Sequence, residues 1–288
     1  MTSPKYFAPS SIKEAISLLS EYGQKAKVIS GGTDLLVQMK HKEWLPDCLI
    51  SIGGISELDY IKYDESSGLK IGVLTNVVTI ANSPLVRSKF NLLAQAASML
   101  GTPTIRNQAT LGGNLCNAAP SADTAPPLLV LGAKAKIIGA DGEKIVPLED
   151  FFTGPGQTIL RNNHLFTEIQ IPNLISHSGG AYLKQTRSQG ADLALVGVAA
   201  LVVMDGKILG DVKIALGAVA PTPVRAKKAE EILKGNKLDD KLLEESSRAA
   251  VNEAKPIDDV RSSADYRRKL VAVLTKRAVT QAVQRAEV

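Results

Sequence analysis

Two Gly-Gly pairs carry the residues of this sequence that are best suited to bind a ligand. Gly31-Gly32 is followed by Thr33 and Asp34, and Gly112-Gly113 is followed by Asn114. Glycine lets the main chain approach a ligand closely, and the N–H groups of such turns can hydrogen-bond a phosphate. A single glycine pair is more often only a tight turn. Two neutral turns of this kind favour a dinucleotide cofactor held by backbone donors over a nucleotide that leaves at each turnover.

The sequence contains no motif of the common catalytic and metal sites. It has no GxGxxG after a strand, no GxxxxGK[ST], no HExxH and no GxSxG. Its two cysteines, Cys48 and Cys116, form no CxxC pair. Its histidines, His41, His164 and His177, have no carboxylate or second histidine at ligand spacing, so we expect them on the surface or in linkers. No catalytic residue and no metal ligand is predicted.

The first glycine pair is expected to join a strand to a helix. Ser10 or Ser11 can cap an earlier amphipathic helix, because Glu14 lies at capping-box spacing. Residues 26–29 then read as a strand and residues 35–40 as a short helix. A strand, a glycine turn and a helix form an arrangement in which backbone N–H groups receive an anion.

The second glycine pair is expected to lie in a long loop. A helix over residues 88–100 should stop at Gly101 and Pro103. Residues 106–123 are rich in Gly, Asn, Ser and Pro and show no regular pattern, and long loops of this kind are usually functional. Within this loop, Asp123 is an isolated acid that could accept hydrogen bonds from a ribose.

The remaining pattern predicts further strands and a helical tail. Strands are expected over residues 48–52, 69–73, 134–138 and 165–171, and helices over residues 225–233, 239–254 and 264–286. Residues 175–180 read as a linker, so we place a domain boundary near residue 176. Residues 196–220 read as a hairpin with a type I′ turn at Asp205-Gly206.

The composition is typical of a soluble globular protein of about two domains: 288 residues, 44% hydrophobic and 22% charged. The longest uncharged apolar run, residues 193–204, is shorter than the roughly 18 residues of a membrane span. The first residues lack a signal-peptide core, so a cytoplasmic location is expected. The net charge of +5 comes with interspersed acids and only 4% aromatic residues, which favours a solvated helix face over a nucleic-acid site.

Two segments match a pair of known cofactor signatures. They are Val28-Ile29-Ser30-Gly31-Gly32-Thr33-Asp34-Leu35 and Thr110-Leu111-Gly112-Gly113-Asn114. Residues 6–11, 106–109, 117–123 and 182–185 extend the match over essentially the whole chain. On these residues the sequence resembles the FAD-binding flavoprotein (medium) subunit of the molybdenum hydroxylases, the family of xanthine dehydrogenase and carbon monoxide dehydrogenase.

The resemblance implies an α+β fold in two domains. The first, residues 1–176, would be an FAD-binding domain of the vanillyl-alcohol-oxidase (PCMH) type, with lobes of about 1–55 and 56–176. The second, residues 177–288, would combine a small antiparallel sheet with helices. Both glycine turns, with Thr33 and Asn114, would hold the diphosphate of FAD. Asp123 would contact the adenosine side, and Lys184 would lie near the flavin ring.

The resemblance also implies partners. A small subunit would carry two [2Fe–2S] clusters and a large subunit a molybdopterin cofactor, together forming a dimer of heterotrimers. Substrate would react at molybdenum, electrons would cross the clusters, and the FAD of this chain would exchange them with an external carrier. Neither nucleic acid nor a membrane span is expected.

Some features depart from particular members of that family. The first signature reads Gly-Gly-Thr-Asp, whereas carbon monoxide dehydrogenases have a Gly-Gly-His-Ser type of sequence, which disfavours carbon monoxide as substrate. Neither signature contains a histidine, so we expect FAD to be bound non-covalently. Cys48 and Cys116 cannot supply the extra [4Fe–4S] cluster found in the flavoprotein subunits of 4-hydroxybenzoyl-CoA reductases.

Two alternatives stay open. A self-contained FAD-dependent oxidoreductase on the same fold, such as a cell-wall enolpyruvyl reductase, would need its own proton donor. Beyond residue 176 only Asp192 and scattered charges of the tail are available. A non-enzymatic basic binding module is supported by the net charge alone.

Overall fold

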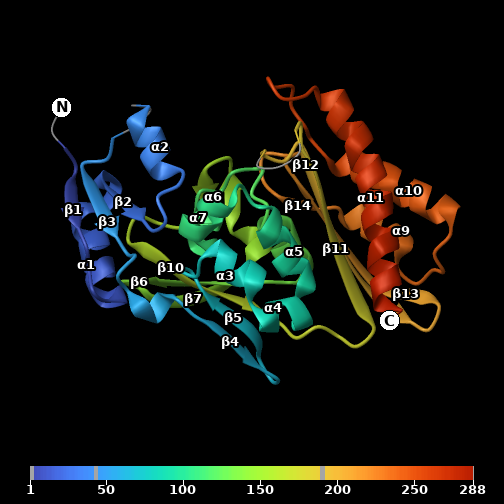
Figure 1. Cartoon of the computed structure of the whole chain (residues 1–288), viewed down its shortest axis with the longest axis horizontal. Coiled ribbons are helices and arrows are strands. Elements are labelled where there is room, and N and C mark those ends of the chain that lie inside the picture. Colours follow the sequence, from blue (N-terminus) through green and yellow to red (C-terminus); the bar gives the residue numbers. More distant parts are fainter. Residues whose placement is uncertain (1–2, 42–44, 189–191, 288) are drawn as a thin grey trace.

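The computed structural model describes residues 3–41, 45–188 and 192–287. In these residues the chain forms sheets of three, five and four strands and one two-stranded ribbon. Figure 1 shows the three larger sheets following one another along the long axis of the molecule, with the N-terminus at one end and helix α11 near the other. The strands and helices together confirm the α+β class.

The N-terminal lobe is a parallel three-stranded sheet in the order β1-β3-β2. Its elements are β1 (Lys5–Phe7), α1 (Ile12–Tyr22), β2 (Ala26–Ile29), α2 (Leu35–Lys40) and β3 (Cys48–Ser51). Helix α1 begins as predicted, because Ser11 accepts a hydrogen bond from the Glu14 N–H. The Glu14 carboxylate reaches back to the N–H of Ser10 instead of that of Ser11.

The central lobe is an antiparallel sheet in the order β4-β5-β10-β6-β7. Its strands are β4 (Ile61–Asp64), β5 (Gly68–Gly72), β6 (Lys134–Gly139), β7 (Gly142–Pro147) and β10 (His164–Ile171), and beside it β8 (Phe152–Gly154) pairs with β9 (Gln157–Thr158). Strand β10 is central and almost completely buried, although it is the last of these five strands in the chain. The strands predicted in this region are confirmed.

Six short helices lie between β5 and β6. They are α3 (Val77–Asn82), α4 (Pro84–Lys89), α5 (Asn91–Met99), α6 (Pro103–Gln108), α7 (Leu111–Cys116) and α8 (Ala125–Val130). The prediction of one helix over residues 88–100 is wrong, because the chain leaves the helical region at Phe90, between α4 and α5. The prediction of a long irregular loop is also wrong. Thr110 caps α7 and buried Leu111 and Leu115 anchor it, which offsets the low helix propensity of two glycines.

The C-terminal part is an antiparallel sheet in the order β11-β12-β13-β14, covered by three helices. Its elements are β11 (Ser178–Gln185), β12 (Val196–Asp205), β13 (Ile208–Gly217), β14 (Val224–Arg225), α9 (Lys227–Leu233), α10 (Asp240–Glu253) and α11 (Ala264–Ala286). The hairpin is confirmed, but its turn differs. Asp205 pairs with Ile208, and of the two residues between them only Gly206 has a positive φ, which fits type II′ and not type I′.

Two hydrophobic cores hold these parts. One core runs through the N-terminal and central lobes and includes Tyr182 and Leu201 from the C-terminal sheet. The other lies between that sheet and its helices. Within the described ranges, no helix is long and apolar enough to cross a membrane.

Candidate functional site

A cavity of about 860 Å³ lies where the three parts of the chain meet. The first glycine turn lines it from the N-terminal lobe, and the second glycine pair and residues 153–166 line it from the central lobe. Asp192 and Leu193, just before β12, also line it. Pockets of roughly 300–1,000 Å³ are typical of small-ligand and cofactor sites.

Most of the predicted site residues line this cavity. Those that line it are Val28, Ile29, Ser30, Gly31, Gly32, Thr33, Asp34, Leu35, Thr110, Gly112, Gly113, Asn114 and Asp123. The side chain of Leu111 instead lies in the hydrophobic core, and Lys184 lies behind the cavity wall. The two signatures, which are far apart in the sequence, therefore meet in one place.

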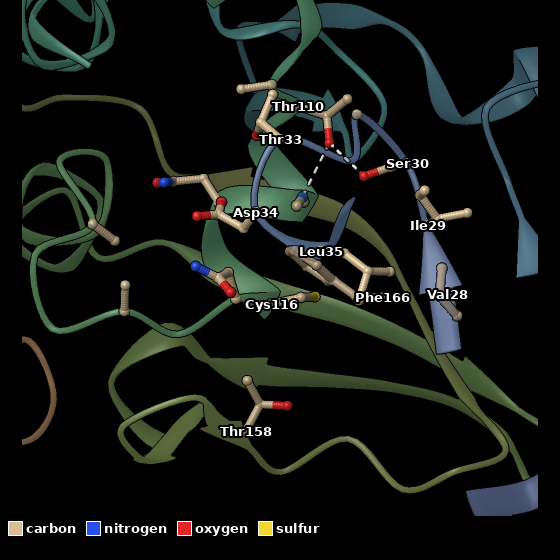
Figure 2. Close-up of a pocket in the computed structure, with 18 of the residues that line it drawn as sticks. Val28, Ile29, Ser30, Thr33, Asp34, Leu35, Thr110, Cys116, Thr158 and Phe166 are labelled. Carbon is tan, nitrogen blue, oxygen red and sulfur yellow. Dashed lines mark hydrogen bonds between the residues drawn. The ribbon is translucent and has the colours of Figure 1, made fainter. Parts of the chain in front are cut away.

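The first glycine turn presents a row of unused main-chain donors. Within the part of the chain that the structure describes, the N–H groups of Gly31 to Leu35 have no acceptor in the protein. Gly32 has a φ of +71°, and helix α2 starts directly after the turn. Figure 2 shows Thr33 and Asp34 on the turn that borders the cavity. Consecutive free N–H groups of this kind form a binding site for an anion.

The second glycine pair uses its main-chain donors inside the protein. The four N–H groups of residues 111–114 donate to Thr75 O, Val73 O, Thr110 Oγ1 and Thr110 O at 2.9–3.0 Å. Its glycines are required by packing. A Cβ on Gly112 would lie 2.5 Å from Val73 Cβ. This turn can therefore reach a ligand only through side chains, such as the amide of Asn114.

A pair of hydroxyl groups joins the two turns. Ser30 Oγ lies 3.0 Å from Thr110 Oγ1, which also accepts the N–H of Gly113 (Figure 2). Thr110 can donate its own hydrogen to Ser30, and the hydroxyl hydrogen of Ser30 is then left for a ligand. Beside them, Gly31 lies directly against the backbone of Gln108, since a Cβ there would be 2.0 Å from Gln108 O.

A buried ion pair lies at the end of the cavity nearest the C-terminal sheet. Asp123 Oδ2 is 2.8 Å from Lys184 Nζ, and Tyr182 donates its hydroxyl to Asp123 Oδ1 at 2.9 Å. Lys184 also donates to Met99 O at 3.0 Å. Burial raises the pKa of the Asp123 carboxyl, while Lys184 and Tyr182 act to lower it. Asp123 and Lys184, which the resemblance assigned to the adenosine side and to the flavin ring, thus contact each other.

One wall of the cavity contains none of the predicted site residues. Residues 153–166 reach it from β8, β9 and β10, and the Gly154-Pro155-Gly156 turn was the only local signal for it. His164 is buried in this wall, so the prediction of a surface or linker histidine is wrong there.

Cys116 also lines the cavity, and burial raises the pKa of its thiol to about 12. Among the described residues, no group of three His, Cys, Asp or Glu side chains could hold a metal ion.

Family comparisons agree with this geometry. Residues 2–174 match the family model of the FAD-binding domain in molybdopterin dehydrogenases. Residues 181–282 match the model of the carbon monoxide dehydrogenase flavoprotein C-terminal domain. The chain belongs to this FAD-binding family. The resemblance drawn from the two signatures is therefore confirmed, and the chain is an oxidoreductase subunit with FAD as its cofactor.

Individual members of the family match over almost the full length. The xanthine dehydrogenase FAD-binding subunit of Escherichia coli O157:H7 is 32% identical over 98% of this chain and 96% of its own. The glyceraldehyde dehydrogenase medium chain of Sulfolobus acidocaldarius is 33% identical over 95% and 96%. A structure of carbon monoxide dehydrogenase from Hydrogenophaga pseudoflava, lacking the Mo-pyranopterin moiety of its cofactor, superposes with a TM-score of 0.96. It shares 33% identity with this chain and covers 99% of this chain and 98% of that one.

Proposed function

We propose that this chain holds FAD non-covalently and passes electrons between the iron–sulfur clusters of a partner subunit and an external carrier. The observation that carries the proposal is the row of free N–H groups from Gly31 to Leu35 in a cavity of cofactor size. When bound, FAD supplies the electron-transfer chemistry, while the protein supplies binding, orientation and electrostatics.

The diphosphate of FAD would lie against the first glycine turn. Its negative charge matches the free N–H groups of residues 31–35, and the Ser30 hydroxyl can add one further donor. Asn114 Oδ1 accepts the hydroxyl of Thr124 at 2.6 Å, which leaves the amide NH₂ of Asn114 for the cofactor. In this arrangement the second turn contributes rigidity and one side chain.

The isoalloxazine ring would lie at the end beside Asp123, and the adenosine at the end formed by residues 156–166. The first end carries the buried ion pair with Lys184 and opens at Leu193, whose side chain is 57% exposed. An exposed rim is needed where electrons enter and leave. The apolar and neutral groups that line the cavity there, such as Val28, Thr158 and Phe166, suit a neutral purine.

The names of the relatives support the proposed partners. These are named as medium chains or FAD-binding subunits of dehydrogenases, which supports a small iron–sulfur subunit and a large molybdopterin subunit beside this chain. We place the FAD-binding domain at residues 1–176 and the C-terminal domain at 177–288, with a dimer of heterotrimers in the cytoplasm as the whole assembly. The substrate would be set in the large subunit.

The test is to express the chain alone and then with its partner subunits. The chain alone should be yellow, and acid precipitation should release FAD into the supernatant. The co-expressed complex should contain iron and molybdenum, and reduction at molybdenum should bleach the flavin. A colourless folded protein that cannot be loaded with FAD would contradict the proposal.

The activity of the isolated chain distinguishes the proposed function from a self-contained oxidoreductase. That reading requires turnover of a small substrate without partners, whereas our proposal predicts only flavin reduction by a reductant in solution. A basic binding module would bind no FAD at all.

A further inference from the structure

We propose that His164 positions the wall of the cavity at its adenosine end and thereby determines how tightly the cofactor is held. The inference rests on the proposed function, because it assumes that adenosine occupies this end. His164 is the first residue of β10, lines the cavity and has a side chain that is only 2% exposed. It belongs to neither glycine signature.

Two reciprocal hydrogen bonds tie His164 to Arg161. His164 Nδ1 accepts the N–H of Arg161 at 3.3 Å, and the N–H of His164 donates to Arg161 O at 3.0 Å. Because Nδ1 is an acceptor here, the hydrogen of the neutral ring is on Nε2. The imidazole thus closes the turn of residues 161–164, much as a capping side chain closes the first turn of a helix.

The ring is enclosed on its other side. Gly139 of β6 pairs with His164, and a Cβ at Gly139 would lie 2.6 Å from His164 Cδ2. Nε2 faces Asp141 Oδ1 at 3.3 Å without the alignment of a hydrogen bond. The missing side chain at residue 139 therefore provides the space in which the ring takes this orientation.

The turn held by His164 is itself part of the cavity. Arg161 and Asn162 line the same end as Leu165 and Thr158. Arg161 is largely exposed, with Nη1 4.0 Å from Asp141 Oδ2, so this weak ion pair cannot fix the turn by itself. Loss of the Nδ1 acceptor would remove one of the two hydrogen bonds that close this turn, and the turn would be less firmly held.

The test compares His164→Leu with His164→Asn in the full-length chain stripped of its flavin. Asn can place its Oδ1 near the position of Nδ1, whereas Leu fills the space without an acceptor. We expect His164→Leu to weaken binding of both FAD and ADP about tenfold and His164→Asn to recover binding to within about threefold of the unchanged protein. ADP is informative because it contains the adenosine and diphosphate but no isoalloxazine.

A second variant displaces the His164 imidazole without replacing His164 itself. Gly139→Ala should push the imidazole from its place and weaken ADP binding as His164→Leu does, with thermal melting used to confirm that each variant is folded. Folded variants that bind ADP as tightly as the unchanged protein would overturn the positioning role while leaving the proposed function intact. If the unchanged chain bound neither FAD nor ADP, the proposed function itself would fail, and the inference with it.

Discussion

Gly31 is the residue at which the first cofactor signature touches the segment just before the second. Its Cα lies so close to Gln108 that any side chain would collide with a backbone carbonyl oxygen, and a backbone group cannot rotate out of the way. The first turn is thus held against the segment that leads into α7. Its free N–H groups keep their direction because of this contact.

Gly31→Ala should therefore release FAD without unfolding the chain. The added methyl group forces the turn away from Gln108, and we expect FAD binding to weaken at least about tenfold, as measured by titration of the flavin-free protein. Gly54→Ala is the matched control, since a Cβ at Gly54 has no atom within 4 Å and its φ is not positive. Equal FAD affinity in both variants would contradict this role for Gly31.

Thr110 connects the signatures through its hydroxyl group. Thr110→Val keeps the shape of the side chain but removes both the cap of α7 and the contact with Ser30. We expect a loss of about 1 kcal/mol in the free energy of unfolding, measured with urea, together with weaker FAD binding. Thr110→Ser should retain both properties. If Val and Ser gave the same result, the hydroxyl would have no such role.

At the scale of the elements, the Asp123–Lys184 pair fastens strand β11 to the C-terminal end of α5. Lys184 comes from the strand, and it reaches both the carboxylate and the carbonyl of Met99, the last residue of the helix. Only 5% of each side chain of the pair is exposed. Each charge has therefore lost most of its water and is compensated by the opposite charge of its partner.

Lys184→Met should destabilise the chain at neutral pH by about 3 kcal/mol, because the Asp123 carboxylate is left buried without its counter-ion. The variant should regain stability as pH falls. A carboxyl whose pKa in the folded state is raised by burial favours folding when protonated, and this contribution disappears as pH rises through the folded pKa. The check is urea unfolding at several pH values. The double variant Asp123→Asn, Lys184→Met should be more stable at neutral pH than Lys184→Met alone, and a further loss would contradict the argument.

The elements differ in how far the sequence predicts them. The strand, turn and helix of residues 26–40 follow from local pattern, and the structure agrees. Helix α7 is not evident in the sequence because its two glycines have low helix propensity. Its cap and its buried leucines stabilise the helix enough to offset them. The wall of residues 153–166 depends on the pairing of β10 with β5 and β6, which are distant in sequence. Local pattern carries no information on such pairing, so His164 could not be assigned to the site.

For the molecule as a whole, the cavity depends on all three parts of the chain at once. The first turn, the wall from β10 and the rim at Leu193 come from three different sheets or their connections. A ligand that binds only this assembled state stabilises every part together.

FAD should accordingly raise the melting temperature of the entire chain in one transition. With free FAD at about 100 times its Kd, the expected gain is about 2.7 kcal/mol in the free energy of unfolding. Differential scanning calorimetry at increasing FAD concentration measures it. A transition that split in two, with only one part responding to FAD, would show that the cavity does not join the three parts.

The place of β10 in its sheet has a consequence for how the protein is made. Strands β5 and β6 each need β10 as a neighbour, yet β10 is synthesised after both, and Leu193 at the rim follows later still. A growing chain on the ribosome therefore carries its first glycine turn long before it has a pocket. All the segments that line the pocket are present only once translation has passed the start of β12.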